Sequence, residues 1–338
     1  MKLKHKHVIG CHVMFYEIEM FSEYIDGCIN AITEIENTQN IIFDFVFNFT
    51  EYFESIDTDK ITKKELMDRF DWETLKLTSK GFRVISVTME NEDPVYNISS
   101  YRRDLNYKYC DKVDFVLWGE TDSLWPKETF QAIESISEYA NRQNHNRYII
   151  AFAYRKMWDD GWKPLEHVDM TDLPFVDTDD WNLNALESPK SYMTIDKMNE
   201  INSKYEEFDI RILNYPKFDG SCLVISSDLI KSGVNIPHAL LCSGEDTSFA
   251  DMAKIVLGDQ YMQFIVKNIL RVHNRRHPKK RSYIKNENNP RGFCDANSKG
   301  QWWKILESMS KHNLGALQKN QSKFYTYNDV LTEMEKVK

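Results

Sequence analysis

The 338-residue sequence has six cysteines but no pair spaced C-x-x-C, and no long apolar run. Because no such pair is present and several cysteines lie in apolar runs, we expect reduced cysteines and a cytoplasmic location. No run reaches the roughly 18 apolar residues of a membrane span. The start, MKLKHKHVIGCHVMFYEIE, is basic and then apolar, but it meets Glu17 and Glu19 and lacks a small-residue cleavage site. We therefore expect neither a signal peptide nor a membrane span.

An excess of positive charge is missing too. The net charge is −9, which argues against wholesale binding to nucleic acid. The charge is uneven, because residues 267–285 hold eight Lys or Arg and no acid, whereas residues 159–187 hold nine acids and one Lys. A local basic patch on an acidic protein can still hold a polyanion. With 42% hydrophobic and 28% charged residues, a folded soluble protein of one large or two smaller α/β domains is expected.

Apolar runs alternate with segments of helical periodicity over the first 150 residues or so. This alternation predicts parallel strands joined by crossover helices in one doubly wound, mostly parallel sheet, an α/β fold. Ligands bind such sheets at the carboxyl ends of the strands. The expected strands are 7–16, 41–49, 82–89, 112–119 and 147–154, and the expected helices are 19–35, 62–77, 97–110 and 126–142. Strand character returns at 208–214 and 220–230, followed by a helix at 244–258 and a strand at 263–273.

Two carboxylates follow the fourth expected strand, in the sequence Gly-Glu-Thr-Asp at 119–122. Carboxylates one residue apart on a turn can reach one hard divalent cation such as Mg²⁺ or Mn²⁺, which in turn bridges the oxygens of a diphosphate. The alternative is a polar turn that caps the next helix, with Asp122 or Ser123 as the N-cap. The local sequence alone favours this alternative.

The order of the motifs over residues 7–280 resembles that of GT-A fold, family 2-like nucleotide-sugar glycosyltransferases. Glu120 and Asp122 take the place of their D-x-D-type motif, and His273 takes that of a late histidine. The resemblance implies that these three side chains bind Mn²⁺ or Mg²⁺, with a UDP-sugar as the donor substrate. The pair Glu245 and Asp246 matches an acidic pair at a helix start. There the resemblance implies Asp246 as the base on the acceptor hydroxyl, with Glu245 as the competing choice.

The donor-binding residues are less well defined, because FYEIEMF replaces the family's usual opening after the first strand and Glu120 replaces an Asp. The R-x-x-L-N run at 102–106 resembles the family's helix before the metal strand. We expect six residues to bind the donor: Tyr16, Glu17, Asn48, Arg102, Arg103 and Asn106. The resemblance also implies a nucleotide-sugar half at 1–155, an acceptor half of the same domain at 156–275, and a basic, aromatic extension at 276–338.

The basic run and the aromatic residues after it suggest an acceptor. Basic residues interleaved with aromatics suit a phosphate backbone and a base displaced from its stack. The abundance of Lys, Asn and Ile is also common in AT-rich phage genomes. In these respects the chain is similar to phage glycosyltransferases that transfer glucosyl or arabinosyl groups to hydroxymethylated bases of DNA, such as hydroxymethylcytosine, in the host cytoplasm. The expected contacts to double-stranded DNA are Arg275, Arg276, Lys279, Lys280 and Arg281.

Three alternatives remain open at this point. The acceptor could be a surface glycan or lipopolysaccharide. Paired carboxylates, a histidine and a basic patch also suit a metal-dependent nuclease or phosphoesterase. A binding module without catalytic activity is the third alternative.

Overall fold

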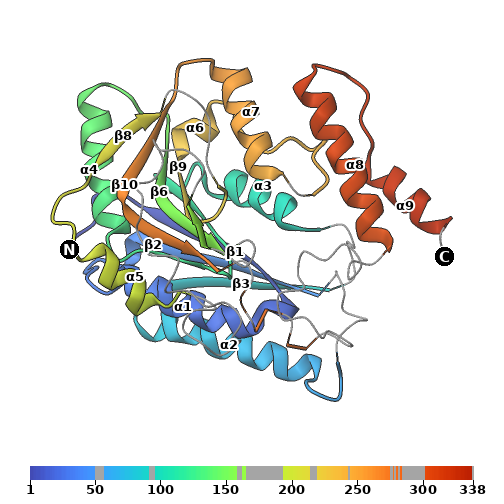
Figure 1. Ribbon diagram of the computed structural model, residues 1–338, viewed down its shortest axis with the longest axis horizontal. Helices are drawn as coiled ribbons and strands as arrows, with labels where there is room; N and C mark the ends of the chain where they lie inside the picture. The colour runs from blue at the N-terminus through green and yellow to red at the C-terminus, as the bar shows by residue number, and fades with distance from the viewer. Residues whose placement is uncertain are drawn as a thin grey trace.

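A computed structural model describes residues 1–49, 57–90, 96–157, 162–164, 193–213, 219–242, 244–274, 277, 279–280, 282–283 and 301–336. Its strands form one sheet in the order β3-β2-β1-β4-β9-β6-β10-β5, with β7 beside β6 and β8 beside β10 (Figure 1). The strands are β1 His7–Met14, β2 Ile41–Asn48, β3 Arg83–Met89, β4 Phe115–Gly119, β5 Ser123–Leu124, β6 Tyr148–Met157, β7 Trp162–Pro164, β8 Ile210–Leu213, β9 Leu223–Ser226 and β10 Met262–His273.

The sheet is mostly parallel, which confirms the expected α/β class. Strands β3, β2, β1 and β4 are parallel to their neighbours, and β10 is parallel to β6. The fifth expected strand, β6, does not lie beside β4, because the later strand β9 runs antiparallel between them. The five strands of the first part of the chain are therefore not all neighbours in the sheet. Apolar periodicity identifies a buried strand but contains no information about its neighbours.

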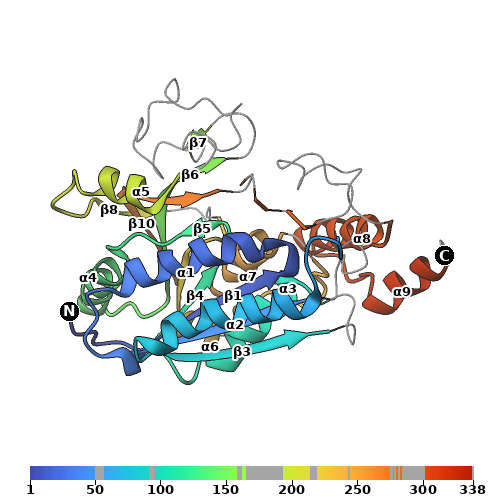
Figure 2. The ribbon, with the colours of Figure 1, turned by 90° about the horizontal axis from the view of Figure 1, so that it is seen from below.

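Helices cover both faces of the sheet (Figures 1 and 2). Helices α1 Ile18–Ile32, α2 Lys63–Ser79 and α4 Thr129–Arg142 share one hydrophobic core with one face of the sheet. Helices α3 Ile98–Tyr109, α6 Ser227–Lys231 and α7 Glu245–Leu257 share a second core with the other face. Strand β4 lies between the two cores, which explains why all five of its residues are buried and why it is a continuous apolar run.

The remaining helices lie outside these two layers. Short 3-10 turns occupy Phe15–Glu17 and Thr38–Asn40, and α5 Ile195–Asn202 lies along β10. Two helices that the sequence did not suggest, α8 Gln301–Gln318 and α9 Tyr327–Glu335, pack on each other and on Leu241 and Cys242. None of the described helices is long and apolar enough to cross a membrane.

Candidate metal and catalytic site

A short antiparallel pairing brings the acidic turn after β4 to the late histidine. The chain turns after Gly119, where the Ser123 amide donates to the Glu120 carbonyl at 2.9 Å. Strand β5 then pairs with the end of β10, so that Ser123 stands opposite His273. The next amide, that of Asn274, donates to the Asp122 carbonyl at 2.6 Å. Backbone hydrogen bonds therefore hold the two motifs together, although they are far apart in the sequence.

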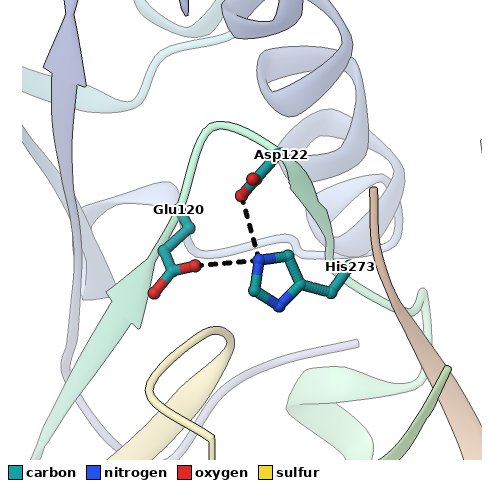
Figure 3. A group of neighbouring side chains, drawn as sticks. All are labelled: Glu120, Asp122 and His273. Atoms are coloured by element: carbon teal, nitrogen blue, oxygen red, sulfur yellow. Dashed lines mark ion pairs between the residues drawn. The ribbon is translucent and has the colours of Figure 1, made fainter. Parts of the chain in front are cut away.

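Glu120, Asp122 and His273 converge as three potential ligands of one cation (Figure 3). Nε2 of His273 lies 3.1 Å from Oε2 of Glu120 and 3.3 Å from Oδ1 of Asp122. One ligand atom from each residue lies within 4.8 Å of the other two. Asp122 and His273 are buried and Glu120 is half-buried. Two carboxylate oxygens and one imidazole nitrogen form a donor set that suits Mn²⁺ well and Mg²⁺ acceptably.

The turn does not cap a helix, so the alternative interpretation of the acidic motif is excluded. Asp122 lies on the turn itself and Ser123 lies in β5. Helix α4 begins only at Thr129, with Glu128 as its N-cap residue. The expected start of this helix at Pro126 was therefore early by three residues.

Lys280 places a positive charge in this site. Its Nζ lies 2.8 Å from Oδ2 of Asp122 and 3.2 Å from Oε1 of Glu17, and the side chain is buried. This position differs from the expected exposed contact to DNA. The neighbouring Lys279 is exposed, whereas three of the other expected contacts, Arg275, Arg276 and Arg281, lie outside the described residues.

The site holds more acidic than basic side chains. Burial alone would raise the pKa of Glu120, but Arg102 and His273 outweigh it and lower that pKa to about 2. Lys280 and His273 likewise keep the pKa of Asp122 well below its usual value despite burial. Burial lowers the pKa of His273, but the negative charges of Asp122 and Asp219 raise it to about 10. A proton on His273 and the Lys280 ammonium thus partly neutralise a region whose carboxylates favour a cation.

The acidic pair Glu245 and Asp246 opens α7, after Gly244 in a left-handed conformation with φ of 86°. Glu245 is buried, and its Oε1 accepts from Nη1 of Arg102 at 2.5 Å. Burial, opposed by Arg102, raises the pKa of Glu245 to about 7. Asp246 is more exposed, and its carboxylate accepts from the backbone amides of Gly220 at 3.3 Å and Thr247 at 2.7 Å and from the Thr247 hydroxyl at 3.4 Å. The more available carboxylate of the pair is therefore that of Asp246.

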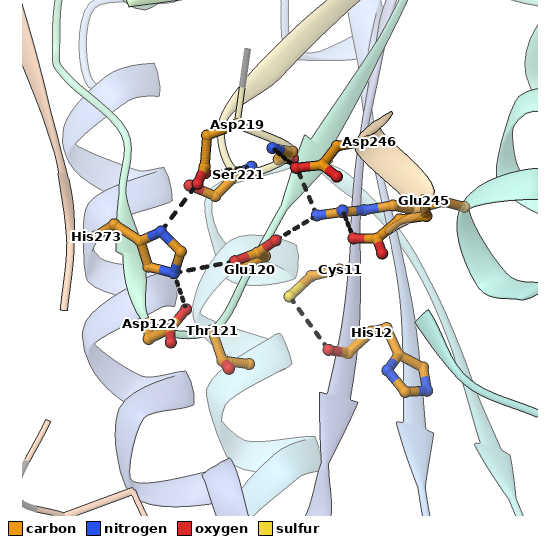
Figure 4. A network of polar contacts seen from close by, with 12 residues as sticks. Cys11, His12, Glu120, Thr121, Asp122, Asp219, Ser221, Glu245, Asp246 and His273 are labelled. Carbon is orange, nitrogen blue, oxygen red and sulfur yellow. Dashed lines mark hydrogen bonds and ion pairs between the residues drawn. The ribbon is translucent and has the colours of Figure 1, made fainter. Parts of the chain in front are cut away.

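Arg102 connects Glu245 of the acidic pair to the metal ligand Glu120, and Figure 4 shows these two carboxylates in one polar network. Its Nη2 donates to Oε1 of Glu120 at 2.7 Å and to the Gly220 carbonyl at 2.9 Å, while Nη1 reaches Glu245. A Cβ atom at Gly220 would lie 2.5 Å from Arg102 Nη1, so the close approach requires glycine there. Arg102 thus lies in the site as expected, but among carboxylates.

The other expected donor-binding residues separate into two groups. Tyr16 and Glu17 are buried at the start of α1, where Oε2 of Glu17 accepts from Thr121 Oγ1 at 2.8 Å. Asn48, at the end of β2, contacts Nε2 of His12 at 2.8 Å. All three lie at the carboxyl ends of β1 and β2, where a ligand is expected.

Arg103 and Asn106 lie elsewhere and hold the loop after α6. Arg103 donates to the carbonyls of Ile236, Pro237 and Leu240 at 2.9–3.0 Å. Asn106 is completely buried and bonds Asn235 at 2.8 Å and Trp118 at 3.0 Å. Both side chains are thus bonded within the protein, and the expectation that they bind the donor stays a prediction. Successive residues of a helix point about 100° apart, so Arg102 and Arg103 face different neighbours.

Sequence reasoning missed Asp219 and Arg271, and it placed Lys280 in a different role. Asp219 lies 3.5 Å from Nδ1 of His273 and 3.0 Å from Nη2 of Arg271. The only sequence signal for Asp219 is an Asp-Gly turn before an apolar strand, which is common. Arg271 could have been found from the period of β10, because residues two apart on a strand share a face and Arg271 therefore shares that of His273.

Comparisons with known proteins find similar solved structures but do not identify a protein family. No protein-family model matches the chain, and a search of curated proteins gives no significant match. The chain is similar to S. aureus TarS residues 1–349, with TM-score 0.43, 10% identity, and coverage of 78% of this chain and 60% of TarS. It is also similar to GalNAc-T7 with UDP, GalNAc and Mn²⁺, with TM-score 0.45, 11% identity, and coverage of 80% of this chain and 44% of that chain.

A third similar structure is glucosyl-3-phosphoglycerate synthase from Mycobacterium tuberculosis in complex with Mg²⁺ and UDP. Its TM-score is 0.38 with 11% identity, and the match covers 80% of this chain and 72% of that one. The chain therefore spans less than two thirds of the length of TarS and of GalNAc-T7. All three TM-scores lie below 0.5, so these structural similarities do not indicate an activity for this chain.

Proposed function

We propose that the protein is a metal-dependent glycosyltransferase that moves a sugar from a nucleoside-diphosphate sugar, a UDP-sugar in the first instance, to an acceptor hydroxyl. The observation that supports this most is the convergence of Glu120, Asp122 and His273 at the carboxyl end of β4, with Asp246 connected to them through Gly220 and Arg102. Carboxylates and an imidazole for a cation, beside a separate carboxylate that can accept a proton, suit metal-assisted glycosyl transfer.

The residues divide the work as follows. Glu120, Asp122 and His273 would hold Mn²⁺ or Mg²⁺, which supplies Lewis-acid stabilisation of the charge on the leaving diphosphate. Asp246 takes the proton from the acceptor hydroxyl as that oxygen attacks the sugar carbon. Arg102 holds the carboxylates of Glu120 and Glu245 in place and keeps Glu120 ionised. Lys280 lies beside Asp122, where its ammonium would add positive charge near the diphosphate.

Release of nucleoside diphosphate from a panel of sugar nucleotides tests the reaction class. The proposal predicts slow release by water in Mn²⁺, selective for one sugar nucleotide, and none in EDTA. A nuclease would instead nick DNA without any sugar nucleotide present. Binding of a nucleotide without release or nicking would support a binding module and would contradict the proposal.

For the acceptor we propose a 5-hydroxymethylated base of phage DNA, with a glucosyl or arabinosyl group as the transferred sugar. The support is the concentration of positive charge at 267–285 and the aromatic residues that follow it. Arg271 and Lys280 are no longer part of that support, because their charges are paired inside the site. A surface glycan is the competing acceptor.

Mass spectrometry of nucleosides distinguishes the two acceptors. Hydroxymethylcytosine-containing DNA, treated with the protein and the sugar nucleotide that it hydrolyses, should yield a nucleoside heavier by one sugar residue. Unmodified DNA is the control and should remain unchanged. Donor hydrolysis without any modified nucleoside would refute the DNA acceptor and leave the reaction class standing.

A further inference from the structure

Asp219 is a buried carboxylate that lies beside Nδ1 of His273, the ring nitrogen that does not face Glu120 and Asp122. It lies on the loop before β9, where its Oδ1 accepts from the Ser221 amide at 3.1 Å and from Nη2 of Arg271 at 3.0 Å. Arg271 also donates to the hydroxyl of Ser221. Arg271 and His273 occupy alternate positions on β10 and therefore face the same side. The loop and the strand thus fix Asp219 beside the imidazole.

The two nitrogens of His273 face different partners (Figure 4). Nε2 faces the metal-binding carboxylates Glu120 and Asp122, at 3.1 and 3.3 Å. Nδ1 is buried and faces Oδ1 of Asp219 at 3.5 Å, slightly longer than a normal hydrogen bond. The ring is buried too, so Nδ1 has no access to bulk water.

A histidine binds a metal ion through one nitrogen and usually donates its other N–H to a carboxylate or carbonyl. That second bond fixes the tautomer and the orientation of the ring, and its loss typically weakens metal binding by 10–100-fold. In this protein the second acceptor is a carboxylate that is itself fixed by a buried arginine.

We propose that Asp219 is a positioning residue for the metal: it accepts a hydrogen bond from Nδ1 of His273, and it thereby leaves Nε2 as the nitrogen that binds Mn²⁺ or Mg²⁺. Arg271 holds Asp219 in this position. The inference rests on the metal site of the proposed function and adds a residue that the motifs Glu-x-Asp and Glu-Asp do not include. It does not depend on the identity of the sugar or the acceptor.

The affinity for Mn²⁺, measured by electron paramagnetic resonance without any sugar nucleotide, tests this role. Asp219→Ala should raise the Kd for Mn²⁺ by about 10–100-fold. Asp219→Asn should have a smaller effect, because its amide oxygen can still accept from Nδ1. Asp209→Asn is the matched control: it changes a carboxylate that is likewise paired with an arginine, Arg211, but is no part of the site, and it should leave the Kd unchanged.

A second readout reports on the ring directly. In the Mg²⁺-loaded protein, ¹⁵N NMR of the His273 side chain should show the proton on Nδ1, and Asp219→Asn should keep it there. A proton on Nε2 in the wild type would overturn the proposal. Because this measurement uses only the wild type and Asp219→Asn, it tests the proposal even if Asp219→Ala does not fold.

His273→Ala separates failure of this inference from failure of the metal site. If wild type and His273→Ala bind Mn²⁺ equally, the metal site itself is refuted, and the role of Asp219 with it. If His273→Ala weakens binding while neither Asp219 variant does, only the positioning role is overturned.

Discussion

At the scale of single residues, the two carboxylates that open α7 differ in their surroundings more than in their chemistry. Glu245 is buried against Arg102, whereas Asp246 is more exposed and accepts backbone amides. We predict that Asp246→Asn lowers kcat by roughly 10²–10⁴-fold with little change in the KM for the donor, because it removes the proposed general base. Steady-state kinetics with the cognate donor and acceptor provide the measurement.

Glu245→Gln is the comparison for this prediction. It should retain more activity, since a neutral amide can still accept one hydrogen bond from Arg102. A dead Glu245→Gln beside an active Asp246→Asn would reverse the two roles. If both variants are active, the acidic pair serves only the start of the helix, where first-turn acids are favourable.

Lys280 gives the second prediction at this scale, because its ammonium lies on the carboxylate that would hold the metal. A cation bound at Oδ1 of this carboxylate would be repelled by the ammonium and would compete with its charge-assisted hydrogen bond to Oδ2, which is worth about 1.5–3 kcal/mol. Lys280→Met should therefore tighten Mn²⁺ binding by roughly tenfold in the absence of a donor. Titration calorimetry can measure this change.

Lys279→Met is the matched control for Lys280, because the neighbouring side chain is exposed. It should leave the affinity for Mn²⁺ at the wild-type value. Weaker Mn²⁺ binding by Lys280→Met would show that the lysine supports the site and does not compete with the metal.

At the scale of the elements, the close packing of β4 against α1 and β1 next to the acidic turn depends on Gly119, the last residue of β4. A Cβ atom there would lie 2.0 Å from the hydroxyl of Tyr24 and 2.9 Å from the Gly10 carbonyl. We predict that Gly119→Ala lowers the free energy of unfolding by about 1–3 kcal/mol, the usual cost of overpacking a core. Urea unfolding followed by circular dichroism measures the change.

Two further variants control this experiment. Gly315→Ala, in α8, meets nothing within 4 Å and should raise the free energy of unfolding by roughly 0.5–1 kcal/mol. Tyr24→Phe should recover part of the loss in the Gly119→Ala background, because it removes the nearest clashing atom. Wild-type stability of Gly119→Ala would show that α1 can move away from β4 at little cost.

The sequence predicted most elements because their signals are local. Continuous apolar runs marked β1, β2 and β4, and helical periodicity over 62–77 marked α2, as observed. The place of β9 could not be predicted, since strand order depends on tertiary packing. Helices α8 and α9 were not predicted, because the basic and aromatic residues of 301–336 were interpreted as a contact to nucleic acid and their helical periodicity was not considered.

For the site, motif order correctly brought Glu120, Asp122 and His273 together, because the carboxyl ends of parallel strands meet at one edge. It could not show which side of a helix or loop a residue faces. That is why Asp219 was not predicted.

At the scale of the whole molecule, buried histidines link folding to pH. His7 lies in the main core beside the rings of Phe115 and Phe130, and burial lowers its pKa to about 3 from a usual 6.5. Between these values the unfolded chain binds a proton that the folded chain does not. The stability that neutral, buried His7 contributes is therefore lost progressively as the pH falls from about 6.5 towards 3. The free energy of unfolding decreases by at most about 1.4 kcal/mol per pH unit.

His7→Phe should remove this dependence. The slope of unfolding free energy against pH should become shallower than that of the wild type between pH 6 and 4, and the two slopes should agree above pH 7. Parallel curves through the acidic range would show that His7 is protonated in the folded protein.

The central claim, that Asp122 holds a divalent cation on which transfer from a nucleotide sugar depends, can be tested by one comparison. Release of nucleoside diphosphate from the cognate sugar nucleotide is measured for wild type and Asp122→Asn, in Mn²⁺, in EDTA, and after Mn²⁺ is restored. Wild type should be active, lose activity in EDTA and regain it with Mn²⁺, while a folded Asp122→Asn stays nearly inactive throughout. Full activity of the wild type in EDTA, or of Asp122→Asn in Mn²⁺, would contradict the claim.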